Sequence, residues 1–302
     1  MSDNDLDIIR QQSRPLAPNA TGVAPRLSRL AGIRCVLFDV YGTLLISGSG
    51  EVGTLLPDAA QGAFAAALAS VGLRTELSDE QGRATLAAAV ADSHRRSRAA
   101  GIDFPEVDIV EIWQMAVQDL LASDGVVEDR TGAADSDIDY ARLALEYELR
   151  TNPVWPMPTA EECVLGLQTQ GIATGLISNA QYFTPRLLQA LLPTAFENLD
   201  SGQDVQYYSY RHGCAKPGET LYRLAAEELA GRGITPREVL YVGNDMLNDI
   251  WPAAKVGFRT ALFAGDQRSL RWREEDPRVA EVTPDLVVTE LASLLNCVAG
   301  ND

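Results

Sequence analysis

The sequence predicts an α/β protein with a doubly wound parallel sheet, into which an all-helical domain is inserted. Over residues 155–302, short β-rich apolar segments alternate with segments of helical spacing. Residues 57–150 differ, because they are rich in Ala, Leu, Glu and Arg and show helical spacing throughout. Alternating strands and helices form a parallel sheet that helices cover on both faces. The helical stretch is therefore an insertion into a core of this kind.

Two breaks mark the ends of the insertion. The segment 47–53 reads SGSGEVG, which is typical of a flexible linker. The segment 151–158 contains three prolines, which stop any helix that reaches them. We therefore assign residues 33–48 and 155–302 to the α/β core and residues 49–154 to the helical domain.

The expected elements run in order along the chain. Residues 1–32 contain few core residues and several prolines, so we expect a flexible N-terminal extension. The apolar run Ile33–Val40 is the first expected strand and contains an acid near its end. The insertion contains four expected helices and no convincing strand: Ala59–Ser70, Asp79–Ala99, Val107–Leu121 and Asp137–Leu149. The rest of the core has expected helices at 159–170, 184–191 and 218–231, and strands at Ile172–Ser178, Gln206–Tyr210, Val239–Val242, Thr260–Phe263 and Leu286–Val288.

Composition argues against several classes of protein. The net charge of −17 disfavours nucleic acid and anionic membranes as main partners, because phosphate groups are bound chiefly by Lys and Arg. No apolar run reaches the roughly 18 residues that a membrane span needs. The cysteines are widely spaced and the N-terminal residues do not resemble a signal peptide, so we expect reduced thiols in a cytoplasmic protein. With only two histidines, catalysis has to use carboxylates, Lys, hydroxyls, amides or a hard metal.

Polar residues follow three of the predicted strands. Asp39 ends the first strand, Ser178 and Asn179 end the second, and Asn244 and Asp245 follow the strand that begins at 239. Ligands of open α/β sheets bind at the carboxyl ends of the strands. We therefore expect these side chains to form one site.

The residues at the first two strand ends also have structural explanations. A carboxylate such as Asp39 can act as a nucleophile or a metal ligand, but it can also cap the turn that contains Gly42 and Thr43. Ser178 and Asn179 can donate hydrogen bonds to a substrate oxygen, but they can also cap the next helix.

Charged residues further along the chain suggest a bound anion and a bound cation. Lys216 stands before a helix start, where the helix dipole disfavours a cation, so it either faces an anion or is a solvated loop residue. Asp245 and Asp249 lie four residues apart and repel each other unless a cation such as Mg²⁺ lies between them. A solvated acidic helix start is the alternative for this pair.

The segments FDVYGTLL, LISN, AKP and VGNDMLNDI, in this order, resemble the four motifs of the haloacid dehalogenase superfamily. The resemblance covers residues 33–48 and 155–295, and the helical insertion resembles the first (C1) class of cap domains in that family. It implies a Rossmann-like core, hydrolase activity on a small anionic substrate, and Mg²⁺ as the cofactor.

The resemblance also implies roles for individual residues. Asp39 matches the nucleophile, and Lys216 matches the cation that orients nucleophile and substrate. Ser178 and Asn179 match the substrate-binding second motif, and Thr43, also expected to bind substrate, matches the turn that supports the first. Four positions match ligands of Mg²⁺: Asp39, the backbone carbonyl of Tyr41, Asp245 and Asp249.

Tyr41 departs from the phosphatase pattern. Phosphatases of this family usually carry a second Asp there, which protonates the leaving oxygen and then activates water. General acid–base catalysis typically increases the reaction rate by about 10²–10⁴-fold. A phenol with a pKa of about 10 can donate a proton but is a poor base at neutral pH. Tyr41 is therefore included among the catalytic candidates with its role open.

The form D-x-Y-G-T also resembles 2-haloacid dehalogenases, which displace halide from carbon and need no leaving-group proton. The fourth motif favours a phosphatase instead, because Asp245 and Asp249 after Gly243 resemble the Mg²⁺-binding phosphatase form. We favour a phosphohydrolase acting on a small phosphorylated metabolite through an aspartyl-phosphate on Asp39. Dehalogenation is the alternative, and a catalytically impaired sensor or scaffold is a second one. The substrate and the oligomeric state are not predicted.

Overall fold

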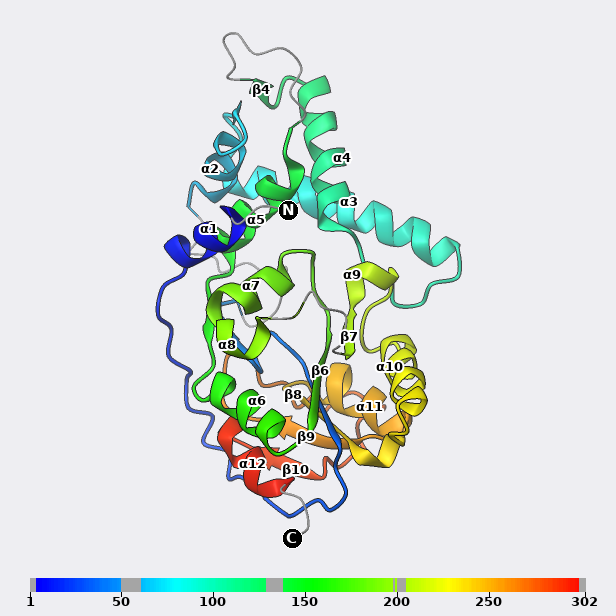
Figure 1. Ribbon diagram of the computed structural model, residues 1–302. Helices are drawn as coiled ribbons and strands as arrows, with labels where there is room; N and C mark the ends of the chain where they lie inside the picture. The colour runs from blue at the N-terminus through cyan, green and yellow to red at the C-terminus, as the bar shows by residue number, and fades with distance from the viewer. Residues whose placement is uncertain (1–3, 50–60, 129–137, 198, 200–204, 299–302) are drawn as a thin grey trace.

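The computed structural model describes residues 4–49, 61–128, 138–197, 199 and 205–298 (Figure 1). Within them, six strands form one sheet in the order β10-β9-β8-β1-β6-β7, and each adjacent pair is parallel. The strands are β1 (Cys35–Phe38), β6 (Ala173–Ser178), β7 (Val205–Tyr208), β8 (Val239–Gly243), β9 (Arg259–Phe263) and β10 (Leu286–Val288). The parallel sheet predicted from the alternating pattern is confirmed.

Helices cover both faces of this sheet. On one face, Val36 and Phe38 of β1 belong to a core with α6 (Ala160–Thr169), α7 (Thr184–Leu191), α8 (Pro193–Phe196) and α12 (Leu294–Cys297). On the other, Cys35 and Leu37 pack in a core with α10 (Thr220–Gly231) and α11 (Trp251–Lys255). Successive side chains of a strand point to opposite faces, so one short apolar strand contributes to both cores. This burial on both faces explains why the strands read as continuous apolar runs.

The insertion forms a helical domain with its own core. It contains α2 (Ala63–Ala69), α3 (Asp79–Ala99), α4 (Ile109–Ala122) and α5 (Tyr140–Thr151), packed around Trp113 and Phe64. Ser78 and Gln81 form a capping box that fixes the start of α3. The structure adds two strands that the sequence does not predict, β3 (Leu73–Arg74) and β4 (Val127–Glu128). Two-residue strands carry too little periodic pattern to be recognised from sequence.

A small antiparallel ribbon joins the two domains. It pairs β2 (Leu45–Ser47), whose last residue begins the first expected linker, with β5 (Val154–Pro156), which lies within the second. The side-chain oxygen of Asn152 accepts hydrogen bonds from the hydroxyls of Ser47 (2.8 Å) and Ser49 (2.9 Å). The described parts of both linkers are therefore hydrogen-bonded to each other. Residues 50–53 of the first linker lie outside the described residues.

The N-terminal segment differs from the expected extension. Residues Asn4–Gln12 form helix α1, and Ile8 and Ile9 are buried in the core that α7 lines. Farther on, Leu30 is buried and its backbone N–H donates to the carbonyl of Cys297. The segment therefore differs from the expected extension in forming a helix and in burying Ile8, Ile9 and Leu30, although most of its other residues are exposed or partly exposed.

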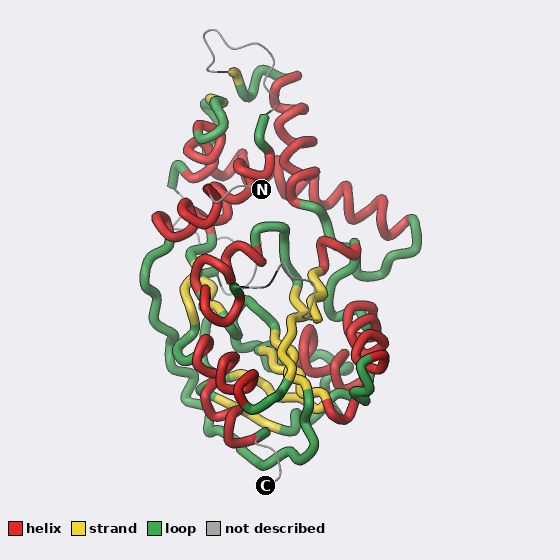
Figure 2. The backbone as a smooth tube through the Cα atoms, viewed as in Figure 1, coloured by secondary structure: helices red, strands yellow, loops and turns green. Residues whose placement is uncertain are grey.

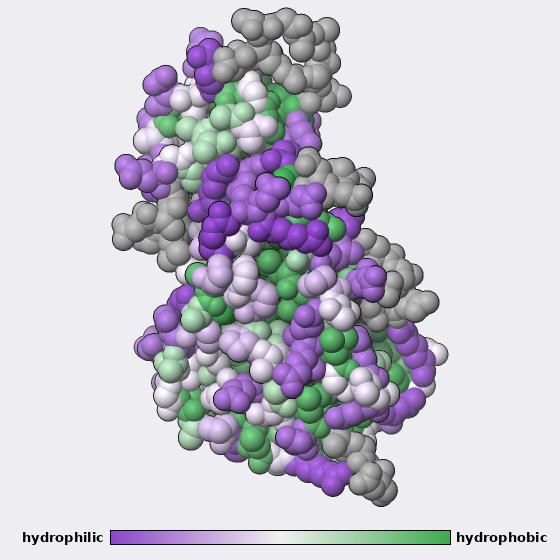
Figure 3. Space-filling model, turned by 60° about the vertical axis from the view of Figure 1, so that its left-hand side comes forward, coloured by the Kyte–Doolittle hydropathy of each residue, from purple (hydrophilic) through white to green (hydrophobic). Residues whose placement is uncertain are grey.

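Hydrophobic residues on the face shown in Figure 3 are scattered among hydrophilic ones. Large exposed apolar side chains such as Leu27, Phe104 and Trp272 come from distant parts of the chain. No helix among the described residues is both long enough and apolar enough to cross a membrane.

The inserted domain contains a cavity of about 470 Å³ next to the linker ribbon, and Glu148 of α5 lines it. Burial raises the pKa of Glu148 from its ordinary 4.5 to about 7, although Asn152 donates a hydrogen bond to the carboxyl group. Other titratable side chains line the cavity: Arg83, His94, Arg98 and Tyr147. The folded protein therefore favours the protonated form of Glu148 more than the unfolded chain does.

Glu148→Gln is expected to stabilise the protein at pH 8 by up to about 3 kcal/mol, because a raised carboxyl pKa lowers stability as pH rises from about 4.5 to 7. The gain should become much smaller at pH 5. Urea unfolding at the two pH values measures it. Glu146→Gln is the matched control from the same helix. Glu146 is paired with Arg142 and Arg150 and its pKa is lowered, so this variant should be less stable at pH 8. Equal stability of Glu148→Gln and wild type at pH 8 contradicts the prediction.

Candidate active site

The carboxyl ends of three neighbouring strands bring candidate residues together. β1 lies between β6 and β8, so Asp39, Ser178 and the segment Asn244–Asp245 share one edge of the sheet. Gln181, just beyond β6, hydrogen-bonds to backbone groups of the insertion. The candidate site therefore lies where the sheet edge meets the inserted domain.

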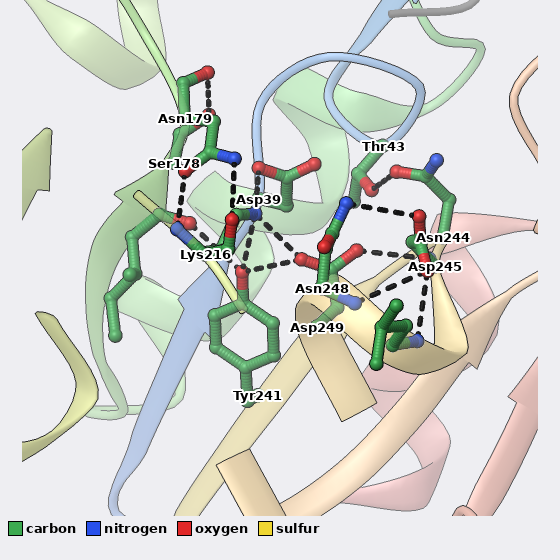
Figure 4. Close-up of polar contacts among 12 residues, drawn as sticks. Asp39, Thr43, Ser178, Asn179, Lys216, Tyr241, Asn244, Asp245, Asn248 and Asp249 are labelled. Carbon is green, nitrogen blue, oxygen red and sulfur yellow. Dashed lines mark hydrogen bonds and ion pairs between the residues drawn. The ribbon is translucent and has the colours of Figure 1, made fainter. Parts of the chain in front are cut away.

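Lys216 lies at the centre of a buried charge cluster (Figure 4). Its ammonium group donates to Oδ1 of Asp39 at 2.7 Å and to Oδ1 of Asp249 at 2.6 Å. Burial lowers the pKa of Lys216, but Asp249 and Asp39 outweigh this effect and the pKa is raised above its usual 10.5. Lys216 is thus a fixed cation beside the predicted nucleophile. Oδ2 of Asp39 has no hydrogen-bond donor among the described residues, which leaves one oxygen for chemistry.

Asn179 holds the backbone of Lys216. Its side-chain oxygen accepts from the Lys216 N–H at 2.8 Å, and its amide group donates to the Lys216 carbonyl at 3.3 Å. The neighbouring Ser178 is fully buried, and its hydroxyl donates to the carbonyl of Asn179. The structure therefore brings both second-motif residues to the site, where Asn179 fixes the position of the lysine.

Asp249 is enclosed by β8 and the π-helical turn Met246–Ile250 (η3). Its Oδ1 accepts from Lys216 and from the hydroxyl of Tyr241 (3.1 Å), and its Oδ2 accepts from the backbone N–H of Asp245 (2.9 Å). A Cβ on Gly243 would lie 2.4 Å from the Asp249 side chain, so only glycine fits there. Burial raises the pKa of Asp249 above its usual 3.8, which Lys216 partly offsets.

The turn after β1 is locked to the turn after β8. Thr43 donates to Oδ1 of Asn244 at 3.0 Å, and the Asn244 amide group donates to the carbonyl of Ser269 at 2.7 Å. Gly42 has φ of 80°, and a Cβ there would lie 2.5 Å from the Ser269 side chain. The Thr43 hydroxyl therefore links the two turns, and its expected contact with substrate stays a prediction.

Asp245 makes different contacts from those predicted. Its Oδ1 accepts from the backbone N–H groups of Leu247 (2.8 Å) and Asn248 (3.2 Å), so it caps η3. Its Oδ2 accepts from Nη2 of Arg273 at 2.6 Å, and Nε of Arg273 lies 3.2 Å and 3.1 Å from the two oxygens. Both oxygens are therefore occupied by donors of the chain.

Two of the residues predicted to bind Mg²⁺, Asp245 and Asp249, do not fit a divalent cation as they are arranged. In the described part of the chain, no three His, Cys, Asp or Glu side chains are placed to hold one ion. Mg²⁺ needs oxygens with vacant lone pairs, whereas Asp245 and Asp249 already bind Arg273 and Lys216. An ion that used Asp245 or Asp249 as well as Asp39 would have to displace Arg273 or Lys216, so no reaction step proposed below passes through a metal.

The Tyr41 side chain does not have the properties of a general base. It is buried, and its hydroxyl shares a 2.8 Å hydrogen bond with the hydroxyl of Thr184. Burial, followed by the nearby charge of Glu148, raises the pKa of Tyr41 well above 10. Tyr41 therefore stays protonated at any physiological pH and cannot activate water by accepting its proton.

Fold and site together are those of a hydrolase of the haloacid dehalogenase type. The family model described as haloacid dehalogenase-like hydrolase matches residues 33–257, and the chain belongs to this family.

Two curated relatives are phosphatases. A glyceraldehyde 3-phosphate phosphatase of Pyrococcus furiosus is 27% identical over 51% of this chain and 64% of its own length, which is less than two thirds of that relative. A ribulose-1,5-bisphosphate 5-phosphatase of Halopiger xanaduensis is 25% identical over 68% of this chain and 88% of its own length.

Solved structures with this fold include dehalogenases and phosphatases. A 2-haloacid dehalogenase from Pseudomonas syringae has a TM-score of 0.53 at 17% identity, with 88% of this chain and 97% of that chain covered. At this identity the likeness shows the fold alone.

Three residues of the site were not predicted from the sequence: Tyr241, Asn244 in its contact with Thr43, and Arg273. A tyrosine in a strand that reads as fully buried was a usable signal, because a buried hydroxyl needs a partner. The basic segment RSLRWR after β9 was another, since it follows a strand end at the same edge of the sheet. Nothing in the sequence indicated which of its arginines reaches Asp245.

Proposed function

We propose that this protein is a phosphohydrolase for a small phosphorylated metabolite, with Asp39 as the nucleophile. The observation that carries the proposal is the arrangement around Asp39. Lys216 holds one carboxylate oxygen, and the other has no donor among the described residues. The phosphatase names of the two curated relatives support phosphorus over carbon as the atom attacked.

In the proposed reaction, Oδ2 of Asp39 attacks phosphorus, and the bond from phosphorus to the leaving oxygen breaks. The leaving oxygen takes the electron pair and requires a proton. Water then attacks phosphorus, the bond from Asp39 to phosphorus breaks, and inorganic phosphate leaves with the carboxylate restored. The proton that this water loses to solvent balances the one that the leaving oxygen takes from solvent. Lys216 stays charged throughout and offsets the negative charge of nucleophile and substrate. The family resemblance implies Mg²⁺ as a cofactor, but Asp245 and Asp249 do not fit it as they are arranged, so no step here uses the ion.

Dehalogenation is the second candidate, and Tyr41 favours it. Displacement of halide needs no proton donor for the leaving group. The buried phenol of Tyr41, which is hydrogen-bonded to Thr184, stands where phosphatases usually have the acid that donates this proton. Tyr41 at this position also leads to a prediction if the protein is a phosphatase. Substrates with good leaving groups should be preferred, because a poor leaving group has no obvious proton donor at this position.

One assay separates these possibilities. Phosphate release is measured from p-nitrophenyl phosphate and from glycerol 3-phosphate, beside chloride release from 2-chloropropionate, each with Mg²⁺ and with EDTA. We expect phosphate release, with the aryl ester turned over about 10²-fold faster or more. Equal rates for aryl and alkyl esters, with chemistry rate-limiting, would refute the leaving-group argument. Chloride release without phosphate release would replace the proposal with dehalogenation.

A further inference from the structure

The loop after β9 is built onto the site by backbone pairing. The N–H of Arg271 donates to the carbonyl of Asn244, and the N–H of Met246 donates to the carbonyl of Arg271, both at 2.9 Å. The Asn244 side chain adds the contact to the carbonyl of Ser269. These bonds hold the loop on either side of Asp245. The segment that carries Arg273 is therefore fixed against the fourth motif.

The conformation of Arg273 depends on this anchoring. Its φ is 54°, in the left-handed region that residues other than glycine rarely adopt. Such a conformation persists where surrounding contacts determine it. The planar guanidinium binds Asp245 through Nε and Nη2, which is the two-donor geometry that suits a carboxylate. The side chain of Asp245 is 7% exposed, so the pair is shielded from water on the acid side.

The acceptor capacity of Asp245 is used up. A carboxylate offers about four lone-pair sites. Those of Asp245 meet two backbone N–H groups of η3, the side-chain amide of Asn248 at 3.1 Å, and the guanidinium of Arg273. Lys216 plays the corresponding part for Asp249. A divalent cation approaching either acid meets a fixed positive charge within hydrogen-bond distance of it.

We propose that Arg273 is a built-in counter-ion that keeps Asp245 as the cap of η3 and excludes a divalent cation from this carboxylate. Arg273 and a metal ion then compete for Asp245. The competition does not depend on whether the substrate carries phosphate or halide. It follows that Arg273 supplies, at Asp245, the positive charge that the sequence motif assigns to Mg²⁺.

Calorimetric titration with Mg²⁺ tests the competition without any assay of activity. Arg273→Gln should bind Mg²⁺ about tenfold more tightly than wild type, because Asp245 is released from a charge-assisted pair. Arg271→Gln is the matched control, since it removes the same charge two residues away. It should change the affinity less than about threefold, as long-range electrostatics in salt would.

The double variant Asp245→Asn, Arg273→Gln removes a neutral pair and leaves the net charge unchanged. If Asp245 is not a ligand in the wild type, this variant binds Mg²⁺ as the wild type does. A loss of tenfold or more in the double variant would identify Asp245 as a metal ligand and overturn the proposal. Equal affinity of Arg273→Gln and Arg271→Gln would overturn it as well. The double variant decides the question even where Arg273→Gln alone proves unstable.

Discussion

Asp39→Asn is expected to lower kcat/KM by about 10⁴-fold or more, because the amide retains the shape of the side chain but is a far weaker nucleophile. The amide oxygen can still accept the hydrogen bond from Lys216, so the rest of the cluster should keep its arrangement. The measurement is turnover of whichever substrate the assay above identifies. The large effect is expected for phosphate and for halide release alike, since both use Asp39 in the same role.

Asp285→Asn is the control for Asp39→Asn. Asp285 accepts hydrogen bonds from Thr260 at the amino ends of β9 and β10, on the opposite edge of the sheet from Asp39. This variant should retain activity within a few-fold of wild type. If Asp39→Asn keeps more than about 1% of wild-type kcat/KM, Asp39 is not the nucleophile and the covalent route is lost.

Lys216→Met is expected to destabilise the protein by about 3–5 kcal/mol at neutral pH, the usual result of removing one partner from a buried charge cluster. Asp39 and Asp249 would then face each other without a cation, and both are buried. Activity should be lost together with stability. Urea unfolding at neutral pH measures the stability change.

A second change separates charge from packing. Adding Asp249→Asn to Lys216→Met removes one of the two uncompensated charges and should restore part of the stability while activity stays absent. Lys255→Met is the control on the surface, where the lysine pairs with Glu219 and is half exposed. Lys255→Met should lower the free energy of unfolding by less than about 1 kcal/mol. If Lys216→Met is no more destabilising than this control, Lys216, Asp39 and Asp249 do not form a buried cluster of charged groups.

The elements predicted best are those whose burial leaves a clear periodic pattern. Strand β10 and helices α3 and α7 have the predicted bounds, because apolar side chains and start signals such as Ser78 coincide there. Strand β5 was expected to be linker and β2 was not predicted as a strand, since three-residue strands next to Gly or Pro resemble loops. The pairing of each depends on a partner more than 100 residues away, which local sequence does not contain.

The candidate site was predictable where strand order determines it. Asp39 and Ser178 end neighbouring strands, and Lys216 reaches them through a loop that Asn179 holds. The partner of Asp245 was not predictable, because Arg273 lies 28 residues farther along in an irregular loop. The sequence also did not show that the neighbouring residues Asn244 and Asp245 have different contacts. Asn244 accepts a hydrogen bond from Thr43, whereas Asp245 accepts from η3 and Arg273.

Helix α1 constrains how the two domains can move. Gln12 donates to the carboxylate of Glu146 in α5 of the insertion at 2.8 Å, while Ile8 and Ile9 of the same helix are buried in the core of the sheet domain. If the ribbon β2–β5 were the only connection, the insertion could rotate about it relative to the sheet domain. In Figure 2, α1 lies between the helices of the insertion and the rest of the molecule. Helix α1 is therefore a further attachment away from the ribbon, in addition to Gln181, and rotation of the insertion requires its contact with Glu146 or its burial in the sheet-domain core to be broken.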